Sequence, residues 1–320
     1  MRVLYTQGNE NIATVYVGVT ERGNRVEFVE SRPDVGGISE KWVIIVSTLR
    51  GCPVRCIMCD AGHFYEGRLT YEEIMEQIEY LVFKYFPDGN VRTKKFKIQF
   101  SRVGEPAFNP EVLKVLKQIS TYNNLIPSIS TVAPKGTDWF FEELTEIKDK
   151  YYLGKFQLQF SIHSTSEKER NNIIPIKKWT LERIAEFGEK FVKDGDKKVT
   201  LNFALAKHFS FDPIVIESLF NPEKFLIKIT PINPTIRSIE NRLESDVDIN
   251  TGSLQKHKES LKALTEKGFE VIISIGNLEE NKIGSNCGMY LKRLESRETR
   301  TISKQSASKP ILSNMSFFTE

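Results

Sequence analysis

Short apolar stretches alternate with amphipathic stretches along most of the chain. The segment 41–47, KWVIIVS, is rich in β-branched residues and predicts a buried strand. In 70–86, Ile74, Ile78 and Leu81 recur at helical spacing and share one face. The same patterns predict strands at 95–101, 127–131, 155–163, 198–205, 224–231 and 270–275, and helices at 110–121, 179–195 and 254–268. Six or more strand–helix units are typical of an α/β fold whose parallel sheet forms a full or partial (βα) barrel.

The two ends of the chain depart from this pattern. Residues 11–31 hold two alternating stretches on either side of ERGNR, which predicts a short β-hairpin before the barrel. Residues 302–320 are polar and aperiodic, which predicts a flexible tail. We therefore expect an N-terminal hairpin extension in 1–40, a barrel core in 41–295 and a polar tail in 296–320.

The composition is that of a chain that can bury its own core. Of its 320 residues 40% are hydrophobic, so disulfides are not needed for stability. No apolar stretch approaches the roughly 18 residues of a membrane span, and no signal peptide is recognisable. We expect a cytoplasmic protein without a membrane partner, in which clustered thiols bind metal or react. The formal net charge of +3 permits a nucleic-acid partner but does not indicate one.

Three of the four cysteines lie in the segment 51–62, GCPVRCIMCDAG. Cys52, Cys56 and Cys59 have the spacing C-x3-C-x2-C directly after a predicted strand. A structural zinc site usually has four protein ligands, and the sequence offers no second pair at the required spacing. Three thiolates suit a 4Fe-4S cluster with one iron open to another ligand. A zinc site and unrelated thiols remain the alternatives.

This triplet after the first strand of a βα barrel resembles the radical S-adenosylmethionine (SAM) superfamily. The resemblance implies that Cys52, Cys56 and Cys59 hold a 4Fe-4S cluster whose open iron binds the amino and carboxylate groups of SAM. It also implies a one-electron donor, such as flavodoxin or ferredoxin, and cleavage of SAM to methionine and a 5′-deoxyadenosyl radical. Met58 stands where the superfamily commonly has an aromatic residue.

Four later segments resemble motifs of the RlmN/Cfr family, which methylates an adenosine of large-subunit ribosomal RNA. They are RVGEPAFNP (102–110), SIST (128–131), FSIHSTSEKERNNIIPIKKW (160–179) and ITPINPT (229–235). The resemblance implies SAM contacts from Gly104, Glu105, Ser130, Ser161, Ile162, His163 and Asn233, with Glu105 binding the methionine amino group. Each segment alone has an ordinary explanation as a turn or strand end. Their shared order at strand ends favours the family, because a barrel builds its active site there.

Two further residues resemble catalytic groups of that family. NCGMY (286–290) resembles its Cys-Gly-Gln motif, which implies that Cys287 accepts a methyl group from SAM and passes the carbon to the RNA base. The ordinary alternative is a half-buried free thiol. Glu27 in RVEFVES resembles the family's proposed proton acceptor, and the alternative is a surface glutamate on a hairpin.

Two features depart from the family pattern. Ile45 stands where the family has a second cysteine, which releases the methylated base through a disulfide. Only about forty residues precede the first barrel strand, too few for the family's N-terminal RNA-contacting domain. Three hypotheses therefore stay open: a radical SAM methyltransferase acting on an adenosine of RNA, a radical SAM enzyme acting on a small molecule or peptide, and a non-catalytic iron–sulfur or zinc protein.

Overall fold

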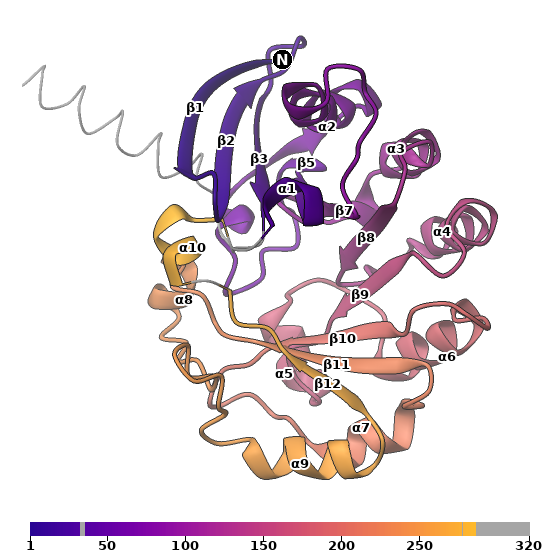
Figure 1. The fold of residues 1–320 in the computed structure, drawn as a ribbon. Helices are drawn as coiled ribbons and strands as arrows, with labels where there is room; N and C mark the ends of the chain where they lie inside the picture. The colour runs from indigo at the N-terminus through magenta and orange to yellow at the C-terminus, as the bar shows by residue number, and fades with distance from the viewer. Residues whose placement is uncertain (33–35, 277, 286–320) are drawn as a thin grey trace, which may run out of the picture.

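The computed structural model describes residues 1–32, 36–276 and 278–285. Its framework is a ten-stranded sheet with the strand order β1-β2-β3-β4-β7-β8-β9-β10-β11-β12. The sheet curves, and the main helices follow its outer side from α2 past α3, α4 and α6 to α9 (Figure 1). Because β1 and β12 end the sheet without pairing to each other, the barrel is partial rather than closed.

The barrel part of the sheet runs from β4 to β12, and all its neighbouring strands are parallel. Its strands are β4 (Lys41–Val46), β7 (Lys95–Phe100), β8 (Leu125–Thr131), β9 (Gln157–Ser161), β10 (Val199–Ala204), β11 (Phe225–Thr230) and β12 (Glu270–Ile273). The larger helices between them are α2 (Tyr71–Tyr85), α3 (Glu111–Ile119), α4 (Asp138–Tyr151), α6 (Leu181–Phe191), α7 (Pro213–Leu219) and α9 (Lys258–Glu266). The predicted α/β barrel is confirmed.

Local sequence explains where the first barrel helix begins and which face it buries. The Thr70 hydroxyl accepts the Glu73 N–H at 3.3 Å, and the Glu73 carboxylate accepts the Thr70 N–H at 2.9 Å. This capping box satisfies two backbone donors that a helix start leaves unpaired. Ile74, Ile78 and Leu81 are fully buried against the sheet, as their spacing predicts.

The N-terminal extension is part of the same sheet. The predicted hairpin is formed by β2 (Ala13–Val19) and β3 (Arg25–Ser31), and β3 pairs antiparallel with β4. A third strand, β1 (Arg2–Asn9), pairs with β2 and was not predicted. Most β1 side chains are exposed, so this strand lacks the apolar alternation that marks a half-buried strand.

One buried carboxylate joins the extension to the barrel. Glu30 on β3 accepts hydrogen bonds from Trp42 at 3.1 Å, from Arg32 at 3.0 Å and from the Tyr85 hydroxyl at 2.8 Å, as well as from the Tyr16 hydroxyl. Burial alone would raise the pKa of Glu30, but the hydrogen bond from Tyr16 and the charge of Arg32 lower it overall. The group is therefore a charged crosslink between β2, β3, β4 and α2.

The remaining elements are short. They are α1 (Gly37–Glu40), β5 (Leu49–Gly51), η1 (Asp60–His63), β6 (Tyr65–Arg68), η2 (Pro106–Phe108), α5 (Glu167–Ile173), α8 (Ile236–Glu240) and α10 (Leu278–Ile283). None of the described helices combines the length and the apolar character that crossing a bilayer requires. The predicted tail and Cys287 lie outside the described residues.

Candidate functional site

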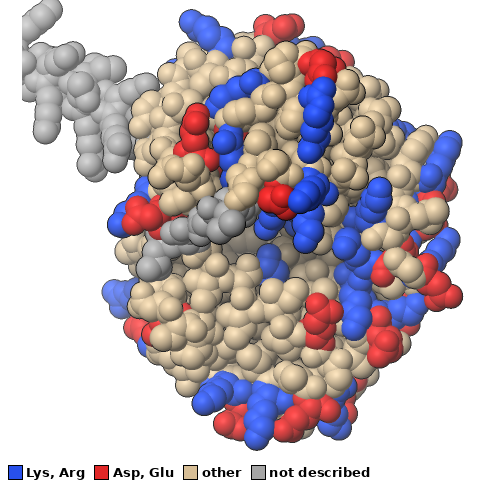
Figure 2. Space-filling view, viewed as in Figure 1, with Lys and Arg blue, Asp and Glu red and all other residues tan. Residues whose placement is uncertain are grey.

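A cavity of about 790 Å³ lies inside the curve of the sheet. Figure 2 shows a hollow in this face of the molecule. The cavity is lined by Cys52, Cys56 and Cys59 and by nearly all the predicted SAM contacts that the structure describes: Gly104, Glu105, Ser130, Ser161, His163 and Asn233. The structure thus gathers around one cavity residues that the sequence spreads over 182 positions, from Cys52 to Asn233.

Ile162 is the exception among the described residues predicted to contact SAM. Its side chain is buried in the hydrophobic core and does not line the cavity. Its backbone N–H donates to the Asn202 carbonyl at 2.8 Å. The neighbouring side chains of Ser161 and His163 line the cavity instead, as alternation along an extended segment requires.

The three cysteines lie on a tight loop between β5 and η1. The Cys52 N–H donates to the Phe64 carbonyl at 2.9 Å, and the Cys59 N–H donates to the Cys56 carbonyl at 3.1 Å. Arg55, between the first two cysteines, has a φ of 59°, in the left-handed region that a non-glycine residue seldom adopts. This conformation turns the chain sharply, so that all three half-buried thiols reach the same cavity.

Burial holds the cavity thiols in their neutral form as long as no cation is near them. Burial raises the pKa of Cys52 to about 11, and burial followed by the charges of Cys52 and Glu105 raises that of Cys56. A nearby metal reverses this effect, because it stabilises the thiolate directly. No three acidic, His or Cys side chains of the described residues converge on a point that would hold a single metal ion. A 4Fe-4S cluster requires no such convergence, and three thiolates suit it.

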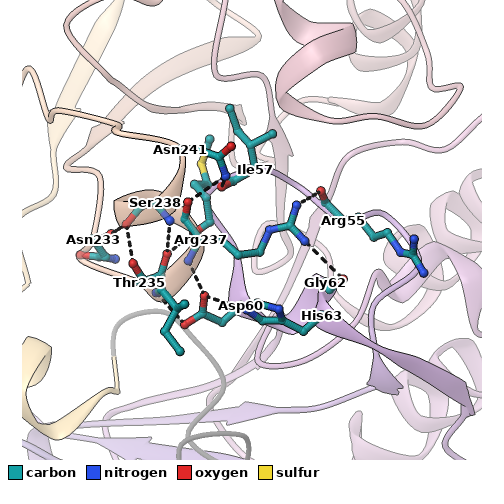
Figure 3. A network of polar contacts seen from close by, with 12 residues as sticks. Arg55, Ile57, Asp60, Gly62, His63, Asn233, Thr235, Arg237, Ser238 and Asn241 are labelled. Atoms are coloured by element: carbon teal, nitrogen blue, oxygen red, sulfur yellow. Dashed lines mark hydrogen bonds and ion pairs between the residues drawn. The ribbon is translucent and has the colours of Figure 1, made fainter.

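Helix α8 fixes the cysteine loop from the far end of the chain (Figure 3). The Asp60 carboxylate, directly after Cys59, accepts the backbone N–H groups of Ile236 at 3.1 Å and Arg237 at 3.0 Å. The Thr235 hydroxyl donates to the Met58 carbonyl at 2.8 Å. Asp60 is almost completely buried, so these bonds are shielded from water.

Two side chains of the same segment hold the loop carbonyls (Figure 3). The Arg237 guanidinium donates to the carbonyls of Arg55 at 3.1 Å and Gly62 at 3.4 Å, and the Asn241 amide donates to the Ile57 carbonyl at 2.9 Å. We call this set of contacts from α8 to the cysteine loop the loop staple. Sequence reasoning missed it. The only signals were an aspartate next to the last cysteine and a threonine N-cap, Thr235, two residues after Asn233.

Glu105 is held rigidly where β7 leads into η2. Its carboxylate accepts the N–H groups of Ala107 at 3.1 Å and Val132 at 2.8 Å, and also the Thr131 hydroxyl. Burial raises the pKa of Glu105 to about 7, although these three hydrogen bonds oppose the rise. A bound ammonium group would restore the charged form, because an adjacent cation lowers a carboxyl pKa.

Gly104 allows the turn that carries Glu105. Its φ of 105° is in a region that side chains other than hydrogen rarely tolerate. A Cβ at this position would lie 2.5 Å from the Leu49 side chain and 2.8 Å from the Leu49 nitrogen. The glycine is therefore required by the close approach of β5, whether or not a ligand is bound.

His163 enters the cavity as a neutral imidazole. Its Nδ1 accepts the Ala204 N–H at 3.0 Å, which assigns the ring proton to Nε2. Burial and the nearby charge of Arg170 lower the pKa of His163 to about 4. The ring therefore offers the cavity a hydrogen-bond donor without a positive charge. Ser130 accepts the Gln159 amide at 3.0 Å, so the Ser130 proton remains available to donate.

Glu27 is buried, and its interpretation as a surface glutamate is wrong. Its carboxylate forms an ion pair with the Arg102 guanidinium, and both side chains are almost fully buried. Arg102 also donates to the carbonyls of Gly284 at 2.7 Å and Ser285 at 2.8 Å. A buried arginine that satisfies a carboxylate and two carbonyls is the physical reason that Glu27 can leave water.

Comparison with known proteins agrees with this geometry. No protein-family model matches the chain. It is 23% identical over 253 residues to the "Probable dual-specificity RNA methyltransferase RlmN" of Petrotoga mobilis, covering 75% of this chain and 69% of that one. It is 26% identical over 273 residues to the "Ribosomal RNA large subunit methyltransferase N" of Nitrosopumilus maritimus, covering 82% and 75% of the two chains.

A solved structure shares the fold. A radical SAM methyltransferase from Sphaerobacter thermophilus superposes with a TM-score of 0.68 at 17% identity, over 89% of this chain and 80% of that one. The predicted fold class and the predicted resemblance to radical SAM enzymes of the RlmN/Cfr type are therefore confirmed. By that relationship the chain is an enzyme of the methyltransferase kind.

Proposed function

We propose that this relative of the RlmN-type radical SAM methyltransferases holds a 4Fe-4S cluster on Cys52, Cys56 and Cys59 and binds SAM beside it. The observation that carries the proposal is that these thiols share one cavity with Glu105 and His163. When bound, the cluster supplies the electron that cleaves SAM. An external one-electron donor, such as flavodoxin or ferredoxin, would reduce it.

The chain's own residues would bind and orient SAM. The Glu105 carboxylate, which the rigid turn positions at the cavity, would accept hydrogen bonds from the methionine ammonium group. Ser130 and the neutral His163 would donate hydrogen bonds without adding charge, and Asn233 and Ser161 would complete the lining. The loop staple would keep the three thiols at fixed separations. Such preorganisation lowers the cost of ordering the site when the ligands bind.

We further propose that Cys287 carries the methyl group to the acceptor, for which an adenosine base of RNA is the first candidate. The relatives are named as RNA methyltransferases. Ser285, two residues before Cys287 in the sequence, lines the cavity, and Arg102 anchors its carbonyl. Ile45, at the position of the family's second cysteine, lines the same cavity. Glu27 would accept a proton, and through its ion pair with Arg102 it would also position the segment before Cys287.

A phosphorylated small molecule is the second candidate acceptor. The observation that favours it is a pair of half-buried lysines, Lys97 and Lys228, on opposite walls of the cavity. An RNA strand presenting a base to the cavity would leave its phosphodiesters at the entrance. These lysines therefore suit a ligand that enters whole and carries its own anionic group.

Mass spectrometry of anaerobically purified protein tests the methyl-transfer step. Incubation with SAM carrying a trideuterated methyl group should add that methyl to the peptide that contains Cys287, and Cys287→Ala should abolish the addition. Under reducing conditions, 5′-deoxyadenosine should then contain deuterium taken from this methyl group. If Cys287 is never methylated and Cys287→Ala turns over an identified substrate normally, the methyl-transfer proposal is wrong.

A further inference from the structure

The interior of the barrel is polar well below the proposed SAM site, that is, toward the amino ends of the parallel strands. The core of a closed (βα) barrel is usually filled with branched apolar side chains. Here the inward positions of the central strands carry amides and hydroxyls: Gln99, Ser128, Gln157, Gln159, Thr200 and Asn202. All of them line the cavity that also contains the cysteines. The lining of the lumen therefore suits a polar ligand, and the lumen is not filled by apolar side chains.

Two lysines face each other across the lower part of this lumen. Lys97 on β7 lies beside Val43 of β4, and Lys228 on β11 lies between Asn202 of β10 and Ile272 of β12. The sheet order puts β8, β9 and β10 between the two strands. Because the sheet curves, Lys97 and Lys228 are on opposite walls. Basic side chains are visible in and beside the hollow (Figure 2).

The charges that act on Lys97 are those of other lysines. Burial, followed by the charges of Lys228, Lys41 and Lys197, lowers the pKa of Lys97 to about 7. Burial also lowers the pKa of Lys228. Within the described part of the chain, neither ammonium group has a carboxylate partner. Two half-buried cations of like charge repel each other, and either the loss of a proton or an anion between them relieves the repulsion.

A buried lysine of the scaffold has different partners from Lys97 and Lys228. Lys148, only 1% exposed, pairs with Asp149 at 2.7 Å and with Asp196, and it donates to the Phe191 carbonyl at 2.8 Å. A buried charge in the scaffold is therefore neutralised from within. Lys97 and Lys228 lack that arrangement and lie in a cavity, which is typical of groups that bind a ligand.

We propose that Lys97 and Lys228 form an anion site that takes the phosphate monoester of a small substrate entering the lumen whole. The inference rests on the radical SAM part of the proposed function and selects between its two candidate acceptors. A phosphate monoester carries nearly two negative charges at neutral pH, which matches two lysines. Lys97 precedes Ser101 at the upper end of β7 by four residues, or about 13 Å of strand. The phosphate would thus lie toward the amino ends of the barrel strands, on the side of the cavity away from Gly104 and Glu105.

Titration of the intact holoprotein with inorganic phosphate and with AMP tests this site. Isothermal calorimetry in phosphate-free buffer should show binding, and added phosphate should raise the melting temperature. Lys97→Met and Lys228→Met should each weaken binding about ten- to a hundredfold, because each removes a charge-assisted hydrogen bond. Lys95→Met is the matched control, since Lys95 is an exposed lysine on the same strand that does not line the cavity.

The control arms separate the possible outcomes. Without ligand, Lys97→Met should melt at a higher temperature than the wild type, because it removes an uncompensated charge. If Lys97→Met does not fold, Lys97→Gln and Lys228→Gln replace it. Absence of phosphate binding, or equal affinity in the wild type and both variants, overturns the proposal.

An RNA arm distinguishes the source of the anion. If a short RNA with a 5′-hydroxyl end binds and is weakened equally by Lys97→Met, the lysines contact phosphodiesters, and the small-molecule proposal is wrong. None of these titrations requires methylation of Cys287. The phosphate titrations can therefore succeed or fail independently of the methyl-transfer proposal, and the two failures are distinguishable.

Discussion

Replacement of Arg102 by methionine tests whether a buried ion pair anchors the segment that precedes Cys287. Methionine preserves much of the side-chain length but removes the guanidinium. The variant would leave the Glu27 carboxylate buried beside an apolar chain and would free the carbonyls of Gly284 and Ser285. Three segments of the chain, from β3, β7 and the end of α10, would lose their common contact.

The expected loss of stability is large. Removing one partner of a buried pair costs about 3–5 kcal/mol, because the remaining charge is uncompensated. Salt screening is weak here, since the side chains of Arg102 and Glu27 are only 2% and 1% exposed. The loss is a substantial part of the roughly 5–15 kcal/mol by which domains are stable. The double variant Glu27→Leu/Arg102→Met removes both charges and should recover most of it.

Urea unfolding followed by tryptophan fluorescence measures the global effect, and hydrogen exchange of residues 278–285 measures the local one. Arg183→Met is the control, because its pair with Asp138 at 3.2 Å is about half exposed and should contribute less than about 1 kcal/mol. Exchange in 278–285 should accelerate in Arg102→Met and not in Arg183→Met. A loss below about 1 kcal/mol with unchanged exchange would refute the anchoring role of Arg102.

Three further predictions concern the site and the scaffold. Cys56→Ala should abolish binding of about four irons per chain, and stoichiometric zinc in a fully active preparation would contradict the cluster assignment. Glu105→Gln should weaken SAM binding about ten- to a hundredfold by calorimetry with iron content unchanged; equal affinity would make Glu105 a structural turn residue. Because its pKa is lowered in the folded protein, Glu30 should contribute stability above its ordinary pKa of 4.5 that is lost as pH falls. Acid unfolding of Glu30→Gln should therefore depend less steeply on pH than that of the wild type, and identical profiles would exclude this role.

The sequence predicted the elements whose residues carry their own signal. The apolar runs of β4 and β7 and the helical spacing of α2 were recognisable because one face of each is buried. Glu105 and His163 were singled out by their resemblance to family motifs, and the parallel topology explained why strand ends would bring such residues together. Those predictions needed no knowledge of distant contacts.

The features that sequence reasoning missed depend on partners far away in the chain. Asp60 has no local pattern that points to the α8 backbone, which lies 177 residues later at Arg237. The burial of Glu27 depends on Arg102, and a charged residue on a hairpin is ordinarily exposed. Neither periodicity nor composition contains such pairings, because both describe neighbours along the chain.

The loop staple has a consequence for the order of biosynthesis. Its bonds join positions separated by about 177 residues, from Met58 to Thr235. At the usual rate of roughly 5–20 residues per second, the ribosome needs about 9–35 s to make that interval. During this time the nascent chain displays three thiols on a loop that lacks its anchor. The loop reaches its final shape only when α8 has emerged and docked, so the proposed cluster would be acquired only after the chain has been made at least as far as α8.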